Sequence, residues 1–382
     1  MAEKNDYDPY EHREVPHPIS DFGAFVNIIK AVLGTGILAA PMANRNAGYL
    51  PAIICTNIIG IFIIHSKLIL VIRKTLLTLD LECSFLYAEK GILSFPRYFK
   101  TLEKPQRTQK YLYIVPNLKS LVPFAMAANF SLIFGFGIIF YYMFSNLQPF
   151  EDLKAFQDFR LYPLFVGATL FAFEAPGLVV SIEANMKQPQ SYVGIGGVLS
   201  QGIYFVILLQ LVFGLLGYWR YGDDIKSAIL QSLPHDELLG NAARIIFAFS
   251  MYISHPLQGY VPIDVMWNNW LKAKVPESKA FVLELVFRVC LAILSVGFAV
   301  AWPNLTLILS FVGAFCLSFL GLIFPAIIDI SIRYEKGYGP MKIHLLLSFV
   351  VILFGVVGGI TGSYVPIEQM VKLYVSGTNL TG

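Results

Sequence analysis

Charged residues are scarce in this sequence of 382 amino acids. Asp, Glu, Lys and Arg together make up 14% of the chain, whereas 56% of it is hydrophobic and the mean hydropathy is +0.63. Soluble domains average about 25% charged and about 45–50% apolar residues, so a water-soluble fold would leave a large apolar surface exposed. The composition therefore excludes a soluble enzyme and predicts an integral membrane protein, with the lipid bilayer as its solvent.

Sequence motifs for catalysis and for cofactor binding are also absent. The chain contains no Gly-x-Ser-x-Gly elbow, no His-Glu-x-x-His motif, no Cys-x-x-Cys pair and no Walker loop. The net charge of +3 is small and its charges are scattered, which does not fit a nucleic-acid surface. We therefore predict no enzymatic activity, no metal site, no organic cofactor and no nucleic-acid partner.

Long apolar stretches make up most of what is present. Each approaches the roughly 20 residues that a helix needs to cross about 30 Å of hydrocarbon. Their all-round apolarity favours helices, because the strands of a membrane barrel would alternate apolar and polar residues. We predict an all-α membrane protein, a bundle of about nine transmembrane helices. The predicted spans are residues 22–43, 50–72, 124–145, 161–182, 194–218, 241–267, 281–302, 305–330 and 343–365.

Positive charge is distributed unevenly between the loops on the two sides of this bundle. Lys and Arg concentrate in the loops that share a side with the N-terminus, which predicts a cytoplasmic N-terminus for this multi-pass protein. Residues 1–21 form a predicted disordered, acidic cytoplasmic tail, and residues 22–365 form the transmembrane domain. Within that domain, residues 73–123 form a long, anomalous cytoplasmic loop. Residues 366–382 are predicted to be an extracytoplasmic tail.

Two predicted spans contain residues that weaken helices. Gly34, Gly36 and Pro41 interrupt the first span, and Pro176 and Gly177 interrupt the fourth. Two interrupted helices are typical of secondary transporters built from inverted repeats, in which half-helix N-termini face an anionic group and freed carbonyls face a cation. This reading predicts a zwitterionic ligand. Helix kinks or close-packing positions are the alternative interpretation of the same residues.

Four polar side chains inside the apolar spans are candidates for proton handling, because such groups are costly in hydrocarbon. They are Asn27, Lys30, His65 and Glu174. An imidazole titrates near neutral pH, which suits His65 to a proton relay. Three of these candidates also have a structural interpretation. Glu174 could hydrogen-bond a neighbouring helix, Lys30 could satisfy broken backbone, and His65 could be a packing residue.

The residues around both interruptions resemble those of the proton-coupled amino acid transporters in the amino acid/auxin permease group. The similarity lies in Asn-Ile-Ile-Lys at 27–30, Gly-Thr-Gly-Ile-Leu-Ala-Ala-Pro at 34–41, and Leu-Phe-Ala-Phe-Glu at 170–174. This resemblance implies a LeuT-like inverted-repeat fold in a plasma membrane or endolysosomal membrane. It also implies transport of small neutral amino acids, by proton-coupled symport or by facilitated transport.

The same resemblance assigns substrate-binding roles to both interruptions. The backbone of the first would hold the substrate carboxylate, and the second would complete the pocket. The residues implied are Gly34, Thr35, Gly36, Ile37 and Leu38, together with Phe173, Glu174, Ala175 and Gly177.

The sequence departs from this family in two respects. Family members have eleven spans, whereas between residues 72 and 117 this chain lacks a counterpart of the third helix and most of the fourth, so the first repeat is incomplete. Asn27 stands where some members carry a histidine implicated in proton handling. Two alternatives therefore stay open beside transport. The first is a non-transporting amino acid sensor or a partner that assembles with full-length relatives, and the second is an inactive variant.

Overall fold

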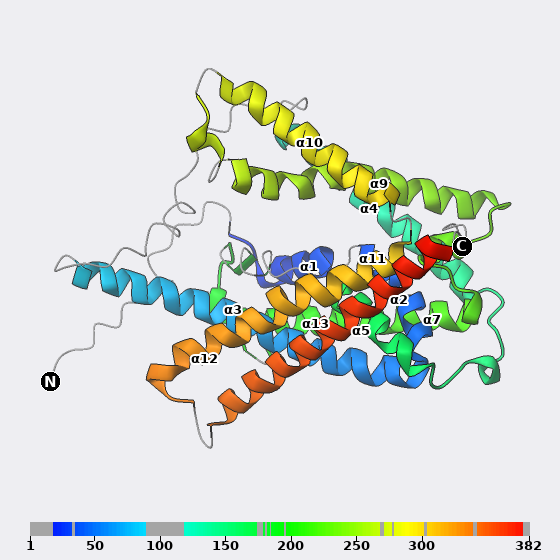
Figure 1. Ribbon diagram of the computed structural model, residues 1–382, viewed down its shortest axis with the longest axis horizontal. Coiled ribbons are helices and arrows are strands. Elements are labelled where there is room, and N and C mark those ends of the chain that lie inside the picture. Colours follow the sequence, from blue (N-terminus) through cyan, green and yellow to red (C-terminus); the bar gives the residue numbers. More distant parts are fainter. Residues whose placement is uncertain are drawn as a thin grey trace. The chain divides into compact units, whose positions relative to one another are not determined.

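The fold is helical in the part of the chain that the computed structural model describes (Figure 1). Among these residues one isolated bridge, between Ile19 and Met186, is the only pairing of β type. The predicted all-α class is therefore confirmed. The described residues are 18–32, 35–88, 118–173, 179, 182–183, 185–194, 196–267, 271–276, 279–301, 304–338 and 342–376.

The helices follow the predicted apolar spans, with ends that differ by several residues. Apart from short 3₁₀ turns, the elements are α1 (Asp21–Val32), the 3₁₀ helix η1 (Thr35–Ala39), α2 (Ala40–Ala47), α3 (Tyr49–Ala88), α4 (Leu118–Phe144), α5 (Tyr162–Ala172), α7 (Val198–Tyr221), α8 (Ile229–Ser232), α9 (Leu238–Met266), α10 (Ala280–Ala301), α11 (Leu305–Val312), the π-helical segment η9 (Gly313–Ile323), α12 (Phe324–Lys336) and α13 (Ile343–Ser376).

Four described helical stretches are long and apolar enough to cross a membrane. They are Tyr49–Ile72, Val198–Asp224, Leu305–Tyr334 and Ile343–Val375. Shorter apolar helices occupy Phe130–Phe144, Phe159–Ala172 and Leu238–Tyr252. These helices are those of a membrane protein, and the count of nine spans stays a prediction.

Helical structure enters the predicted cytoplasmic loop at residues 73–123 from both ends, and the location of this loop stays a prediction. Helix α3 continues to Ala88, and helix α4 already begins at Leu118. Residues 73–88 contain no Gly or Pro and are rich in Leu, so nothing in their sequence ends the helix where the apolar span ends. The rest of this loop lies outside the described residues.

The last residues of the predicted N-terminal tail, from Pro18 to Asp21, lie in the described part of the chain. The amide of Ile19 donates to the carbonyl of Asn185 at 2.8 Å, and its carbonyl accepts from the amide of Lys187 at 2.9 Å. The Ser191 hydroxyl donates to the Asp21 carboxylate at 2.9 Å. These bonds tie the start of α1 to the segment before α7, and the tail prediction now concerns only residues outside the described part.

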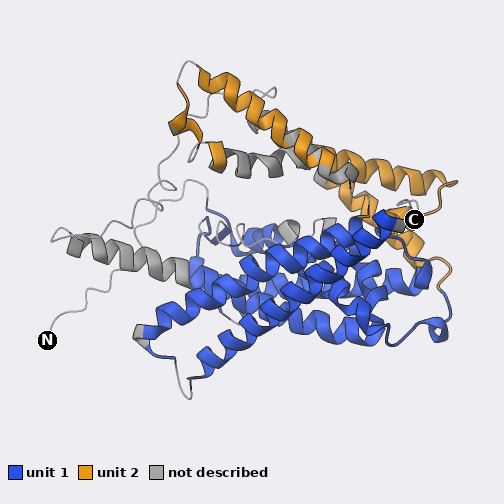
Figure 2. Ribbon diagram, in the orientation of Figure 1, with its two compact units in different colours: residues 1–99, 148–228, 305–379 blue, residues 100–147, 229–304, 380–382 orange. Residues whose placement is uncertain are grey.

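The chain divides into two compact units, and each unit is made of segments that are separated in the sequence (Figure 2). Unit 1 contains residues 1–99, 148–228 and 305–379, and unit 2 contains residues 100–147, 229–304 and 380–382. In unit 1, helix α5 packs against α2, α11, η9 and α13, while α7 packs against α1, α2 and α3. In unit 2, helix α4 packs against α9, where the Phe136 ring meets the Phe247 ring edge-on at 5.2 Å.

Small residues allow the helices of unit 1 to approach closely. A Cβ atom built on Gly313 of η9 would overlap the carbonyl oxygen of Gly167 in α5. Transmembrane helices lack the hydrophobic driving force that water supplies, so such backbone contacts are a main source of helix association. Around them lies a core with fully buried aromatic and aliphatic side chains such as Phe165, Tyr192 and Leu199. The candidate site is built entirely within this unit.

Candidate functional site

The first predicted helix interruption lies next to the end of α5, the helix that precedes the second one. The first predicted span is an α-helix, α1, up to Val32, and it is a 3₁₀ helix, η1, from Thr35. Helix α5 ends at Ala172, and Phe173 follows in a turn. A Cβ atom on Gly36 would lie 2.6 Å from the Cα atom of Ala172, so the backbones of η1 and α5 are in direct contact. The fold thus brings together two segments that are far apart in the sequence.

The structure describes some of the predicted substrate-binding residues. Gly36, Ile37, Leu38 and Phe173 are buried, and Thr35 begins η1. Of the proton-handling candidates, Asn27 lies half-buried on α1, His65 is half-buried on α3, and Lys30 belongs to α1. The roles of all of these residues stay predictions. Outside the described residues lie Gly34, Glu174, Ala175 and Gly177.

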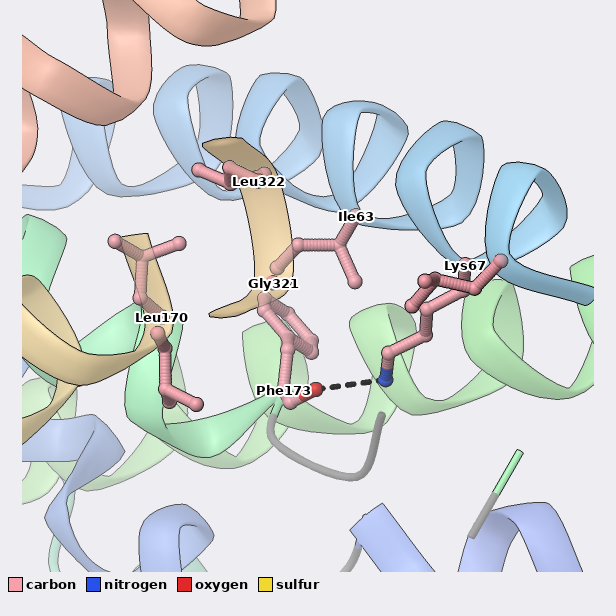
Figure 3. Close-up of a pocket in the computed structure, with 8 residues that line it drawn as sticks. Ile63, Lys67, Leu170, Phe173, Gly321 and Leu322 are labelled. Atoms are coloured by element: carbon pink, nitrogen blue, oxygen red, sulfur yellow. Dashed lines mark hydrogen bonds between the residues drawn. The ribbon is translucent and has the colours of Figure 1, made fainter. Parts of the chain in front are cut away.

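A buried lysine reaches the end of α5 from helix α3. The side chain of Lys67 is 4% exposed, and its ammonium donates a hydrogen bond of 2.8 Å to the carbonyl oxygen of Phe173 (Figure 3). Beside it is a cavity of about 20 Å³, roughly the room needed for one water molecule. The cavity is otherwise almost entirely apolar. Its lining residues are Ile63, Lys67, Leu70, Leu170, Phe173, Leu317, Gly321 and Leu322.

A second buried polar group connects α12 and α13. Asp329 of α12 is 1% exposed, and its carboxylate oxygens accept from Nε of Arg333 at 2.9 and 3.1 Å. The hydroxyl of Ser348 on α13 donates to the same carboxylate at 3.2 Å. A carboxylate buried inside an apolar helix bundle needs such donors, because desolvation would otherwise disfavour its charge.

Helix α3 carries the imidazole of His65 within electrostatic range of this carboxylate. Its Nε2 atom is buried and has no hydrogen-bond partner in the part of the chain that is described. Asp329, Arg333 and His344 lie close enough to act on its charge. Imidazole and carboxylate groups placed together in a membrane are the usual components of proton relays.

Lys67 and Asp329 are not among the site residues predicted from the sequence. Both lie inside predicted spans, at 50–72 and 305–330. The available signal is the one that selected His65 and Glu174, namely an ionisable side chain within a run of apolar residues. Applied to every span, that criterion would have found both residues, although it could not have named their partners.

These features define a class of protein, a helical membrane protein in which η1 and the end of α5 meet beside a buried lysine. A sequence model for the family described as "Transmembrane amino acid transporter protein" matches residues 109–368. The chain therefore belongs to this transmembrane amino acid transporter family. Its class of function is the transport of amino acids across a membrane, and the predicted membrane location is confirmed at this level.

Two curated relatives are similar to most of the chain. One is the "Proton-coupled amino acid transporter-like protein pathetic" of Drosophila melanogaster, which is 31% identical over 98% of this chain and 90% of the relative. Another is "Vacuolar amino acid transporter 3" of Saccharomyces cerevisiae, 23% identical over 91% of this chain and 56% of the relative. The resemblance stated from the sequence is confirmed.

The alignment with the Drosophila relative is longer than this chain. It extends over 429 positions, whereas this chain has 382 residues in all. The relative therefore carries residues within the aligned region that have no counterpart in this chain.

Proposed function

We propose that this protein moves small neutral amino acids across a membrane as a secondary transporter, by proton-coupled symport or by facilitated transport. The observation that carries the proposal is the direct contact between η1 and the end of α5, at Gly36 and Ala172. Broken helices place unpaired backbone groups at the midplane of a bundle, where they match the carboxylate and ammonium of a zwitterion. We further propose a cytoplasmic N-terminus and residence in the plasma membrane or an endolysosomal membrane.

Uptake by the purified protein tests this function directly. We expect liposomes containing the full chain to accumulate radiolabelled L-alanine in a saturable manner, with competition by unlabelled small neutral amino acids. Empty liposomes define the background. Protein-containing liposomes that stay at this background for every small neutral amino acid would exclude transport.

We assign proton coupling, as part of the same proposal, to His65 and the neighbouring Asp329. The buried Nε2 of His65 has no described hydrogen-bond partner, and a carboxylate lies near it. For a proton-coupled carrier, we expect L-alanine uptake to rise as the external pH is lowered from about 7.5 to about 5.5, across the range in which imidazole titrates. His65→Gln keeps a polar side chain without this titration, so we expect the pH dependence to flatten.

The matched control is His235→Gln, because His235 is exposed in unit 2. This variant should retain the wild-type pH profile. A wild-type protein whose uptake does not depend on pH would favour facilitated transport and exclude coupling. A pH-dependent profile that survives unchanged in His65→Gln would remove His65 from the proton path.

A second candidate function is amino acid sensing without transport, or assembly with full-length relatives. It is favoured by the residues that the Drosophila relative has and this chain lacks, because a missing pair of helices would leave the site incompletely enclosed. L-alanine binding without flux would support this function. Saturable flux by the purified chain alone would exclude it, and neither binding nor flux would indicate an inactive variant.

A further inference from the structure

Lys67 carries its positive charge in the interior of the helix bundle. Lysines near the ends of transmembrane helices extend their ammonium groups to the headgroup region. Lys67 does the opposite, because its side chain is 4% exposed and its ammonium lies 2.8 Å from the carbonyl oxygen of Phe173. The rest of the cavity lining is almost wholly apolar, including Ile63 and Leu322, so a buried charge requires a partner here.

The carbonyl that accepts this hydrogen bond lies at the carboxyl end of helix α5. The C-terminal end of a helix carries a partial negative charge, and its last carbonyls have no partners within the helix. In transporters with interrupted helices, carbonyls at such ends coordinate the coupling cation. At Phe173 the cation is supplied by the protein itself, from helix α3 (Figure 3).

The end of α5 that accepts this hydrogen bond also contacts η1. Phe173 directly follows Ala172, whose Cα atom lies against Gly36 of η1. A displacement of the α5 end would therefore move the backbone against which η1 is packed. Because the contact is between backbones, no flexible side chain is available to absorb that movement.

We propose that Lys67 is a positioning residue for the substrate site, in which its ammonium acts as a tethered cation. It holds the carboxyl end of α5 in the geometry that η1 requires, in place of a mobile cation. This inference rests on the proposed function of amino acid binding and transport. Lys67 acts through Phe173 and Ala172, and it is assigned no contact with the substrate.

The test is equilibrium binding of radiolabelled L-alanine to the detergent-purified full chain. We expect Lys67→Ala to weaken binding by about 10-fold or more, the typical effect of losing a charge-assisted hydrogen bond. Lys67→Arg, which keeps the charge, should bind more tightly than Lys67→Ala. Leu68→Met, at the next position of the same helix, is the matched control and should bind as the wild type does.

Chemical rescue separates the charge from the packing. Lys67→Ala removes three methylenes and the ammonium, a fragment that n-propylammonium reproduces. We expect n-propylammonium, but not 1-propanol, to restore L-alanine binding to Lys67→Ala. Binding in detergent involves no proton gradient that an amine could dissipate, and size-exclusion chromatography confirms that the variant is folded.

The results of these experiments distinguish a failure of the role proposed for Lys67 from a failure of the proposed function. Wild-type protein that binds L-alanine while Lys67→Ala binds it equally well would overturn the inference alone. Rescue by 1-propanol as good as rescue by n-propylammonium would overturn it too, because the role of Lys67 would then be packing. Wild-type protein that neither binds nor transports small neutral amino acids would overturn the proposed function, and the inference with it.

Discussion

We expect Gly36→Ala to abolish L-alanine uptake and to lower the free energy of unfolding by about 1–3 kcal/mol, the usual cost of overpacking a core. The added Cβ atom would lie 2.6 Å from the Cα atom and 3.1 Å from the Cβ atom of Ala172. Since the nearer atom belongs to the backbone, α5 and η1 must separate, and that separation falls within the proposed substrate site. Proteoliposome uptake and thermal unfolding of the purified variant measure the two effects.

The control for Gly36→Ala is Gly137→Ala in helix α4. A Cβ atom at Gly137 would meet no other group within 4 Å. Alanine is favoured over glycine in a helix by up to about 1 kcal/mol, so this substitution should stabilise slightly and leave uptake unchanged. Adding Ala172→Gly to Gly36→Ala should not restore uptake, because the Cα atom remains. Full uptake by Gly36→Ala would show that the close backbone contact is not needed for transport.

The sequence could predict the helical fold because its signals are local. A stretch of about 20 apolar residues specifies a membrane helix regardless of its neighbours. Likewise Gly34, Gly36 and Pro41 weaken a helix through their own backbone properties, and the described structure changes from α1 to η1 at this place. The extension of α3 to Ala88 was missed because helix formation does not stop where hydropathy falls.

The site could be predicted only in part, because its contacts join residues that are distant in the sequence. Lys67 and Phe173 are separated by 106 positions, and no periodicity in either segment indicates that they meet. His65 was selected from the sequence, but its neighbour Asp329 lies on α12, near the other end of the chain. Such pairs depend on how α3, α5 and α12 pack, which is a property of the whole bundle.

We expect Asp329→Leu to be strongly destabilising, at the lower end of the roughly 3–5 kcal/mol that follows removal of one partner from a buried ion pair. The substitution would leave the Arg333 guanidinium and the Ser348 hydroxyl without their acceptor between α12 and α13. The lower end applies because the Arg333 side chain is 27% exposed, so water screens part of its charge. Thermal unfolding followed by tryptophan fluorescence measures the loss.

The double variant Asp329→Leu/Arg333→Met separates the structural role of this carboxylate from its proposed role in proton coupling. Replacing both charges with apolar side chains removes the unpaired guanidinium and leaves only the Ser348 hydroxyl without its acceptor, so the double variant should recover most of the lost stability. If Asp329 also takes part in proton transfer with His65, the stable double variant should still lack pH-dependent uptake. A double variant as unstable as Asp329→Leu would contradict the ion-pair account. A stable double variant with the wild-type pH profile would confine Asp329 to a structural role.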